Sequence, residues 1–389
     1  MKKIICIIAL ICVMALSLTS CEILGGLLDP NKKDYNYALE LIERGRYEDA
    51  YEALKKLDGY APAEAELENF YVIPIGYIQK PKNNPNNKIT YEAEYNDKNL
   101  VTKITYTSPS ESAVHSFSYD SKGNVTRHMY ELAIGSYNEL KVTENTFDSN
   151  NKLVKSVITP TRGGSDTEEY EYDSKGNVTK ITYTTNTSTT SATSYAEYTY
   201  DAKGNLTKEV ITGSTGFKTI TENTYDTKGR LTKEVITNQQ INQERTTEYS
   251  YNADGKIAEE RHSTITAPGS YHPGGGVNYK ITYSYDENGN LTKRSNIYDT
   301  STIDTLYTYN KINQPTKVEV VYSYGTTNTY EFEYDNYGAI SKMNTTLDFD
   351  VEITWKLAYY KNGVPENIAK LIDTVSHYFN DLKVPHFTR

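Results

Sequence analysis

The residues that could perform catalysis are few in this chain and lie far apart. No two of the six histidines lie at a spacing that commonly binds metal, such as His-x-x-x-His. They occupy positions 115, 128, 262, 272, 377 and 386. The sequence also has no Gly-x-Ser-x-Gly motif and no glycine-rich phosphate loop. We therefore expect no metal, no cofactor and no enzymatic activity.

Carboxylates are plentiful, but many of them belong to one recurring turn sequence. The stretch "YDSKGNVT" at 119–126 returns unchanged at 172–179. An aspartate at this position of a turn accepts backbone N–H groups. The related stretch "DENGN" at 286–290 has the composition of a calcium loop but lacks the distal glutamate of such loops. We interpret these aspartates as turn residues rather than as acid–base pairs or calcium ligands.

Tyrosine is the abundant side chain with binding chemistry, at 37 of 389 residues. Its ring can stack on the apolar face of a sugar while its hydroxyl forms a hydrogen bond. A binding face would present several such rings in a row, and loops that interrupt a regular pattern also often bind. The candidate binding residues are Tyr170, Tyr198 and Tyr283 in regular segments, and Tyr271 and His272 in an irregular segment from Thr264 to Tyr279.

These tyrosines are positioned by a repeat. Eleven copies, aligned on the tyrosine before the turn or its replacement, start at 95, 119, 147, 172, 200, 225, 251, 285, 309, 334 and 359. The period is about 26 residues, which is typical of repeat architectures. Aromatic and polar residues alternate before each turn, and a partner segment follows it, so each copy is predicted to be a β-hairpin. The glycine of the turn, as in Gly176, Gly204 and Gly289, is expected to have positive φ.

Composition favours a thin β structure. Hydrophobic residues make up 37% of the chain, and this figure includes the tyrosines. The deficit of aliphatic residues is filled by Tyr and Thr, which favour strands, so disorder is not predicted. At least half of the tyrosines must then form the core.

The recurring segments resemble the YD repeats of the Rhs family over residues 90 to 365. The resemblance rests on "YDSKGNVTR" at 119, "YDSKGNVTK" at 172, "YDAKGNLTK" at 200 and "YDTKGRLTK" at 225. It implies hairpins that spiral into a hollow shell around a C-terminal toxin, and in some members carbohydrate binding. No toxin-sized segment follows the last copy here, which puts an encapsulating role in doubt.

The predicted fold is mainly β, with an open antiparallel sheet of about 22 strands. At about 4.8 Å per strand, a flat sheet would be roughly 105 Å wide. Such wide sheets seldom stay flat, and strand twist accumulates across them. We therefore expect a coiled or C-shaped ribbon whose open edges need covers.

The segments on either side of the repeats predict helices. Residues 34–70 show helical spacing with Gly45 as a stop, and "GRYEDAYEAL" resembles part of one tetratricopeptide unit. This segment is interpreted as a cap or spacer, with a linker and sheet entry at 71–89. After Pro365, apolar residues at helical spacing favour a C-terminal cap helix over 366–389, and a final strand is the alternative.

The first twenty residues resemble a bacterial lipoprotein signal peptide. Lys2 and Lys3 precede a thirteen-residue apolar run, which is too short to span a bilayer. The sequence Leu-Thr-Ser-Cys then matches a lipobox, and the resemblance implies cleavage before Cys21 and lipid on its sulfur. Residues 21–33 would form a tether. The expected location is therefore the outer side of the bacterial cell membrane, or the outer membrane.

Charge narrows the range of partners. The formal net charge is -10, and loss of two lysines with the signal peptide changes it to -12. An acidic chain is a poor partner for nucleic acid. We expect a binding or adhesion surface for an envelope glycan or protein, with a structural scaffold as the alternative and a glycan-acting enzyme as the least favoured interpretation.

Overall fold

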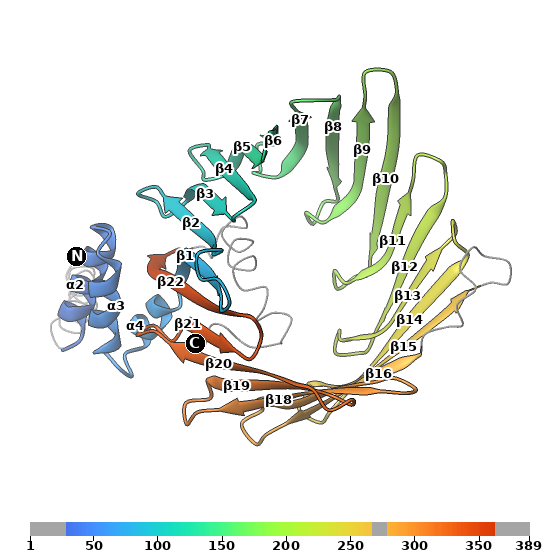
Figure 1. The fold of residues 1–389 in the computed structure, drawn as a ribbon. Helices are drawn as coiled ribbons and strands as arrows, with labels where there is room; N and C mark the ends of the chain where they lie inside the picture. The colour runs from blue at the N-terminus through green and yellow to red at the C-terminus, as the bar shows by residue number, and fades with distance from the viewer. Residues whose placement is uncertain (1–28, 267–277, 362–389) are drawn as a thin grey trace, which may run out of the picture. The chain divides into compact units, whose positions relative to one another are not determined.

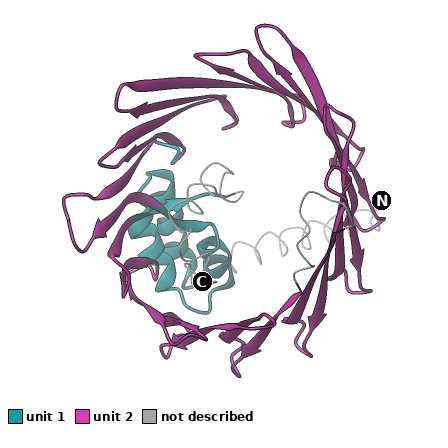
Figure 2. Ribbon diagram, turned by 45° about the vertical axis from the view of Figure 1, so that its right-hand side comes forward, with its two compact units in different colours: residues 1–73, 97–99, 355–372 teal, residues 74–96, 100–354, 373–389 magenta. Residues whose placement is uncertain are grey.

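The computed structural model describes residues 29–266 and 278–361. The chain divides into two compact units, which Figure 2 colours separately. Unit 1 contains residues 1–73, 97–99 and 355–372, and unit 2 contains 74–96, 100–354 and 373–389. Among the described residues, no helix has the length and apolar character needed to cross a membrane. The predicted C-terminal helix and the signal peptide lie outside the described residues.

The described part of unit 1 contains three short helices, shown in blue in Figure 1: α2 (Lys32–Glu43), α3 (Tyr47–Lys55) and α4 (Ala61–Leu67). Helix α2 ends before Gly45, which has a φ of 70°. Small and aliphatic side chains at helical spacing are buried, among them Ala38 and Leu54. These helices confirm the prediction of helical structure within residues 34–70.

The remaining described elements are 22 strands, most of them joined as hairpins (Figure 1). They are β1 (Phe70–Pro81), β2 (Ile89–Tyr95), β3 (Val101–Thr107), β4 (Glu111–Tyr119), β5 (Val125–Ile134), β6 (Tyr137–Phe147), β7 (Leu153–Pro160), β8 (Ser165–Tyr172), β9 (Val178–Asn186), β10 (Ser191–Tyr200), β11 (Leu206–Thr212), β12 (Lys218–Tyr225), β13 (Leu231–Asn238), β14 (Gln243–Tyr251), β15 (Ile257–Thr266), β16 (Tyr279–Tyr285), β17 (Leu291–Ile297), β18 (Thr302–Tyr309), β19 (Pro315–Tyr322), β20 (Thr327–Tyr334), β21 (Ile340–Thr345) and β22 (Phe349–Tyr359).

The repeated turn has the predicted geometry. Asp173 Oδ1 accepts the backbone N–H groups of Lys175 at 2.8 Å and of Asn177 at 2.9 Å. The register of β8 and β9 shifts by one residue between Glu171 and Tyr172, which marks a bulge. Gly176 has a φ of 94°, and the corresponding values are 90° at Gly204 and 79° at Gly289. The predicted positive φ of these glycines is confirmed.

Gly176→Val is expected to destabilise unit 2 by about 1–2 kcal/mol, because a β-branched side chain is penalised at positive φ. Urea unfolding followed by circular dichroism measures the loss. Gly213→Val is the matched control, since the φ of Gly213 lies outside the left-handed region and an added Cβ would meet its nearest neighbour at an ordinary 3.7 Å. Equal losses in the two variants would contradict this account of the turn.

The predicted open, C-shaped ribbon is wrong, because the sheet closes. Neighbouring strands pair antiparallel in chain order, and β1 pairs with both β2 and β22. Figure 2 shows the strands of unit 2 following one another around a ring. Closure removes the free sheet edges that an open ribbon would expose. The result is a closed 22-stranded antiparallel β-barrel.

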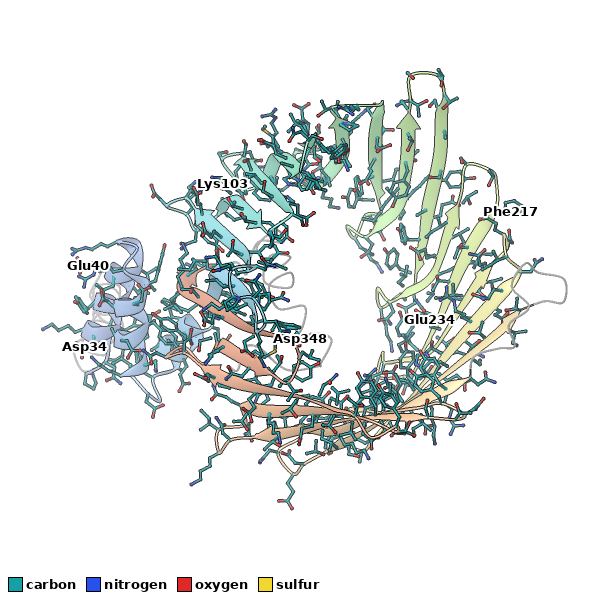
Figure 3. The ribbon with its side chains drawn as sticks, in the orientation of Figure 1. Asp34, Glu40, Lys103, Phe217, Glu234 and Asp348 are labelled. Atoms are coloured by element: carbon teal, nitrogen blue, oxygen red, sulfur yellow. The ribbon has the colours of Figure 1, made fainter. Side chains whose placement is uncertain are left out.

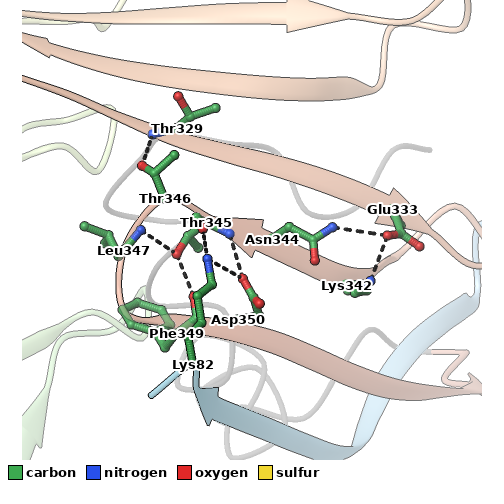
Figure 4. A network of polar contacts seen from close by, with 10 residues as sticks. All are labelled: Lys82, Thr329, Glu333, Lys342, Asn344, Thr345, Thr346, Leu347, Phe349 and Asp350. Atoms are coloured by element: carbon green, nitrogen blue, oxygen red, sulfur yellow. Dashed lines mark hydrogen bonds and ion pairs between the residues drawn. The ribbon is translucent and has the colours of Figure 1, made fainter. Parts of the chain in front are cut away.

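Polar contacts hold the seam between β1 and β22. Lys80 Nζ lies 2.6 Å from a carboxylate oxygen of Glu352. The backbone N–H of Lys82 donates to the carbonyl of Asp348 at 2.7 Å. The ammonium group of Lys82 lies 3.4 Å from a carboxylate oxygen of Asp350 and also donates to the carbonyl of Thr345, as Figure 4 shows. Asp350 in turn accepts the Thr345 N–H at 2.9 Å.

The densest core of unit 2 lies beside this seam. Val318, Ile340, Met343 and Val351 are almost fully buried, and Tyr330 and Phe332 pack on the same face of the sheet. Elsewhere in the sheet most strand residues are only half-buried. The thin core expected from the composition is therefore present over most strands, and the aliphatic residues concentrate where the sheet closes.

Candidate binding face

The register of the strands places the candidate tyrosines on one face of the sheet. Tyr170 is opposite Ile181, which is also opposite Ala196, and side chains alternate between faces, so Tyr198 shares the face of Tyr170. The same reasoning continues to β18. We call this the tyrosine face and define it by Tyr170, Tyr183, Tyr198, Glu209, Glu234, Tyr249, Glu260, Tyr283, Arg294 and Tyr307. Figure 3 labels Glu234 among them.

The opposite face carries cross-strand ion pairs. Lys155 lies 3.0 Å from Glu169, and Lys208 lies 2.8 Å from Glu222. On β10, Glu197 and Thr199 of this charged face are exposed, whereas Tyr198 between them is half-buried. Side chains converge on the inner face of a closed sheet and are therefore less exposed. We assign the tyrosine face as the inner face.

The tyrosine that precedes each repeated turn has a structural role. Its hydroxyl donates to a backbone carbonyl of the preceding hairpin. The acceptor is the first residue of the second strand of that hairpin, for example Val178, which accepts from Tyr200 at 2.9 Å. Other members of this hydroxyl ladder are Tyr119, Tyr172, Tyr225, Tyr251, Tyr285, Tyr309 and Tyr334. Phe147 has no hydroxyl, and there Asn145 donates its amide to the equivalent carbonyl of Val125 at 2.9 Å. Asn223 makes the same contact with the Leu206 carbonyl at 3.1 Å beside Tyr225, so this amide contact also occurs where the hydroxyl is present.

The tyrosines two residues before the ladder are arranged differently, because they meet carboxylates. The Tyr170 hydroxyl donates to Glu168 on the same strand, and Tyr198 lies close to Tyr183 and Glu209. Tyr183, Tyr198 and Glu209 lie on the neighbouring strands β9, β10 and β11. Burial raises the pKa of Tyr198 to about 12, and burial together with Glu168 raises that of Tyr170. The hydroxyls therefore stay protonated at neutral pH and can donate hydrogen bonds.

A second cluster lies on β14 to β16. The Tyr283 hydroxyl donates to Glu260 Oε1 at 2.6 Å, and Glu260 Oε2 lies 3.2 Å from His262 Nε2. The other ring nitrogen of His262 lies 3.2 Å from the Thr247 hydroxyl. The ring of Tyr279 stacks on His262, with centroids 4.3 Å apart and planes 6° apart. Aromatic, carboxylate and imidazole groups thus occur within one patch.

Two histidines that lie thirteen residues apart in sequence meet across β4 and β5. His115 Nδ1 and His128 Nε2 are 2.9 Å apart, beside the rings of Phe117 and Tyr130. Burial lowers the pKa of His115 to about 4, with a smaller contribution from the neighbouring imidazole, and burial also lowers that of His128. One neutral ring must donate and the other accept, so protonating both would break the contact.

Unit 2 is accordingly expected to lose stability as the pH falls from about 6.5 to about 4. The unfolded chain binds protons on these histidines in that window while the folded chain does not, so the free energy of unfolding falls with pH. For His115 the loss is about 2 kcal/mol once solvent screening is allowed for. Urea unfolding at several pH values measures it. An unchanged slope in the His115→Gln, His128→Gln double variant would contradict this assignment.

No group of three or more potential metal ligands occurs among the described residues. Asp286 Oδ1 accepts the backbone N–H of Asn290 at 2.7 Å, and Oδ2 accepts its side-chain amide at 2.9 Å. Asp120, Asp173 and Asp201 make the same two contacts in their own turns. The segment at 286–290 is therefore built like an ordinary repeat turn.

The structure brings together only part of the candidate set. Tyr170, Tyr198 and Tyr283 share the tyrosine face, while Tyr271, His272 and Cys21 lie outside the described residues. Glu168 and Glu260 were not among the residues predicted from sequence, although Glu168 lies two residues from Tyr170 and Glu260 two residues from His262 on the same strand. That period-two spacing was the available signal. The histidine pair and Arg294 were also missed, because only strand register places them.

Comparisons with known proteins concern the repeats and the fold. The family model of the RHS repeat matches residues 172–216. Among curated proteins, none matches this chain. The crystal structure of TcdB2-TccC3 is 13% identical with a TM-score of 0.33, and the match covers 67% of this chain and 19% of that one. A porin-like protein from Bacteroides uniformis is 12% identical with a TM-score of 0.28, covering 73% and 96% respectively. The chain therefore carries Rhs-type YD repeats, and it spans less than two thirds of the TcdB2-TccC3 chain.

Proposed function

We propose that this chain is an exported repeat protein of the bacterial cell envelope whose tyrosine face binds glycan chains without cleaving them. The observation that carries the proposal is the repeated combination of half-buried tyrosine rings and carboxylates on one face, as at Tyr170 and Glu168 and at Tyr283 and Glu260. Rings contact the apolar face of a sugar, and carboxylates accept its hydroxyl protons. Repetition multiplies weak contacts through effective concentration.

The Tyr198→Ala variant is expected to weaken binding of cell-wall glycan fragments about tenfold, because one ring and one hydroxyl contact are lost. Isothermal titration calorimetry with purified fragments measures the affinity. Tyr195→Ala is the matched control. Tyr195 lies on the same strand but on the charged face, where Lys180 is 5.3 Å from its ring. Equal affinity in wild type and both variants would exclude the tyrosine face, and turnover of the fragments would overturn the non-enzymatic interpretation.

A structural scaffold of the envelope is the second candidate function. The hydroxyl ladder favours it, because that role accounts for many of the tyrosines without any ligand. A scaffold predicts no saturable binding of any envelope glycan. It also predicts that substitutions on the tyrosine face change stability alone.

The membrane tether of the proposal is Cys21. Replacing Cys21 by Ala is expected to abolish incorporation of radiolabelled palmitate and to move the protein from the membrane fraction to the soluble fraction. Unchanged labelling and fractionation would show that Cys21 is not the tether.

Tyr271 and His272 remain candidate contacts for a ligand. Their substitution can be tested in the same calorimetric titrations with glycan fragments.

A further inference from the structure

The two ends of the closed sheet differ in chemistry. Because successive strands are antiparallel, connections alternate between the two ends. Connections with the repeated turn, from 120–124 to 335–339, form what we call the repeat-turn rim. Connections between one repeat and the next, such as 135–136, 213–217 and 239–242, form the spacer rim.

Charge is distributed unequally between these rims. Each connection of the repeat-turn rim from 120–124 to 335–339 carries at least one charged residue, such as Asp173 and Lys175. Several connections of the spacer rim carry none and consist largely of Ser, Thr, Gly, Asn and Gln. These uncharged connections are 108–110, 135–136, 187–190, 213–217, 239–242 and 323–326. These six connections could therefore leave bulk water without desolvating a charged side chain of their own.

Exposed apolar side chains follow the same division. Phe217 is 50% exposed and Ile265 is 66% exposed, both at the spacer rim, and Figure 3 labels Phe217 at its turn. The other large apolar side chains exposed at or beside this rim are Ile134, Tyr137, Ile211, Ile241 and Tyr324. Among the described residues, Ile312 is the one exposed large hydrophobic at the repeat-turn rim, at 70%.

These side chains concentrate in one arc of the spacer rim. Phe217, Ile241 and Ile265 lie on connections or strand ends from β11 to β15, which spans roughly 20 Å at about 4.8 Å per strand. Two exposed cations, Lys218 and Arg245, lie within the arc, together with the exposed Glu244. Aromatic and aliphatic tips beside basic residues suit the boundary between lipid headgroups and acyl chains.

We propose that the spacer rim docks onto a lipid bilayer surface. Its apolar tips are separated along the edge of a ring, whereas a protein partner with an ordinary interface needs a contiguous buried core. An extended fluid surface can contact all the tips at once. The charged repeat-turn rim then faces water. This inference rests on the closed sheet and not on glycan binding.

The test is flotation with vesicles of phosphatidylcholine and phosphatidylglycerol. The full chain carries Cys21→Ala in every sample, so that the predicted lipid makes no contribution and all variants share one N-terminus. A variant combining Phe217→Ser, Ile241→Ser and Ile265→Ser is expected to lose about tenfold or more in vesicle partitioning. Ile312→Ser, at an equally exposed site on the other rim, is expected to partition like the parent chain.

A second readout locates the contact. Phe217→Trp is expected to show fluorescence quenching by lipids brominated in their acyl chains, whereas Ile312→Trp is not; the natural Trp355 is buried in both. Equal partitioning of the triple and Ile312→Ser variants would overturn the proposal. So would self-association that depends on the same three residues without vesicle binding, because the rim would then contact a second copy of the chain.

Discussion

Replacing Val351 by aspartate should destabilise unit 2 by about 4 kcal/mol or more. Val351 is almost fully buried on β22, opposite Met343. The substitution removes buried apolar area and introduces a carboxyl group with no polar partner designed for it. A loss of this size is a large share of the net stability of an ordinary domain. We expect the urea unfolding midpoint to fall sharply.

Val321→Asp provides the matched control. Val321 lies on the opposite face from the neighbouring core residue Val320 and is half-buried, so its carboxylate can remain hydrated. Asp304 is directly opposite position 321, so repulsion between the two carboxylates adds to the loss, and the expected total is about 1–2 kcal/mol. If both aspartates cost the same, the aliphatic core beside the seam would not be the main source of stability in that region.

Tyr334→Ala should cost about 3 kcal/mol or more, because it removes a half-buried ring together with its hydrogen bond to the Pro315 carbonyl. Tyr334→Phe keeps the ring and should cost about 1 kcal/mol, the usual value of one hydrogen bond. Urea unfolding separates the two contributions. Burial raises the pKa of this tyrosine, so its hydroxyl remains a donor well above neutral pH.

The repeat at Phe147 offers an internal comparison for the hydroxyl ladder. There Asn145 supplies the donor to the Val125 carbonyl. Asn145→Ala should therefore cost about as much as Tyr334→Phe, since both leave one carbonyl of the same type without its donor. A negligible cost in both variants would show that water satisfies these carbonyls and that the ladder does not stabilise the sheet.

The local structure of the repeats could be predicted from sequence because it depends on neighbouring residues. The contacts of Asp173 and the positive φ of Gly176 both lie within one turn of five residues. The helical segment over residues 34–70 was also predicted, because its apolar spacing is local. In each case the determining interaction links residues that are close in the chain.

Closure could not be predicted in this way, because it depends on pairing between the first and last strands. The segment 71–89 was interpreted as a linker and sheet entry, and residues 71–81 of it belong to β1. Its apolar run "FYVIPIGYI" was a signal for a buried strand. The accumulated strand twist predicted a coiled or C-shaped ribbon, and only the pairing of β1 with β22 shows that the sheet closes.

The candidate binding face was predicted in part for a similar reason. The alternation of side chains along one strand predicts that Tyr170 and Tyr172 lie on the same face. The register between strands determines which carboxylates on neighbouring strands they contact. The two residues also have different roles that the sequence does not distinguish. Tyr172 donates to the Leu153 carbonyl, whereas Tyr170 contacts Glu168.

Zero-length carbodiimide cross-linking of Lys80 to Glu352, followed by mass spectrometry of the monomer, tests the closed sheet most directly. The two charged groups are 2.6 Å apart across the seam, so an amide bond between them is predicted. Lys208 and Glu222, 2.8 Å apart on adjacent strands, should cross-link whether the sheet is open or closed. In an open sheet of these strands the ends would be separated by up to about 100 Å. A 208–222 link without an 80–352 link would therefore contradict closure.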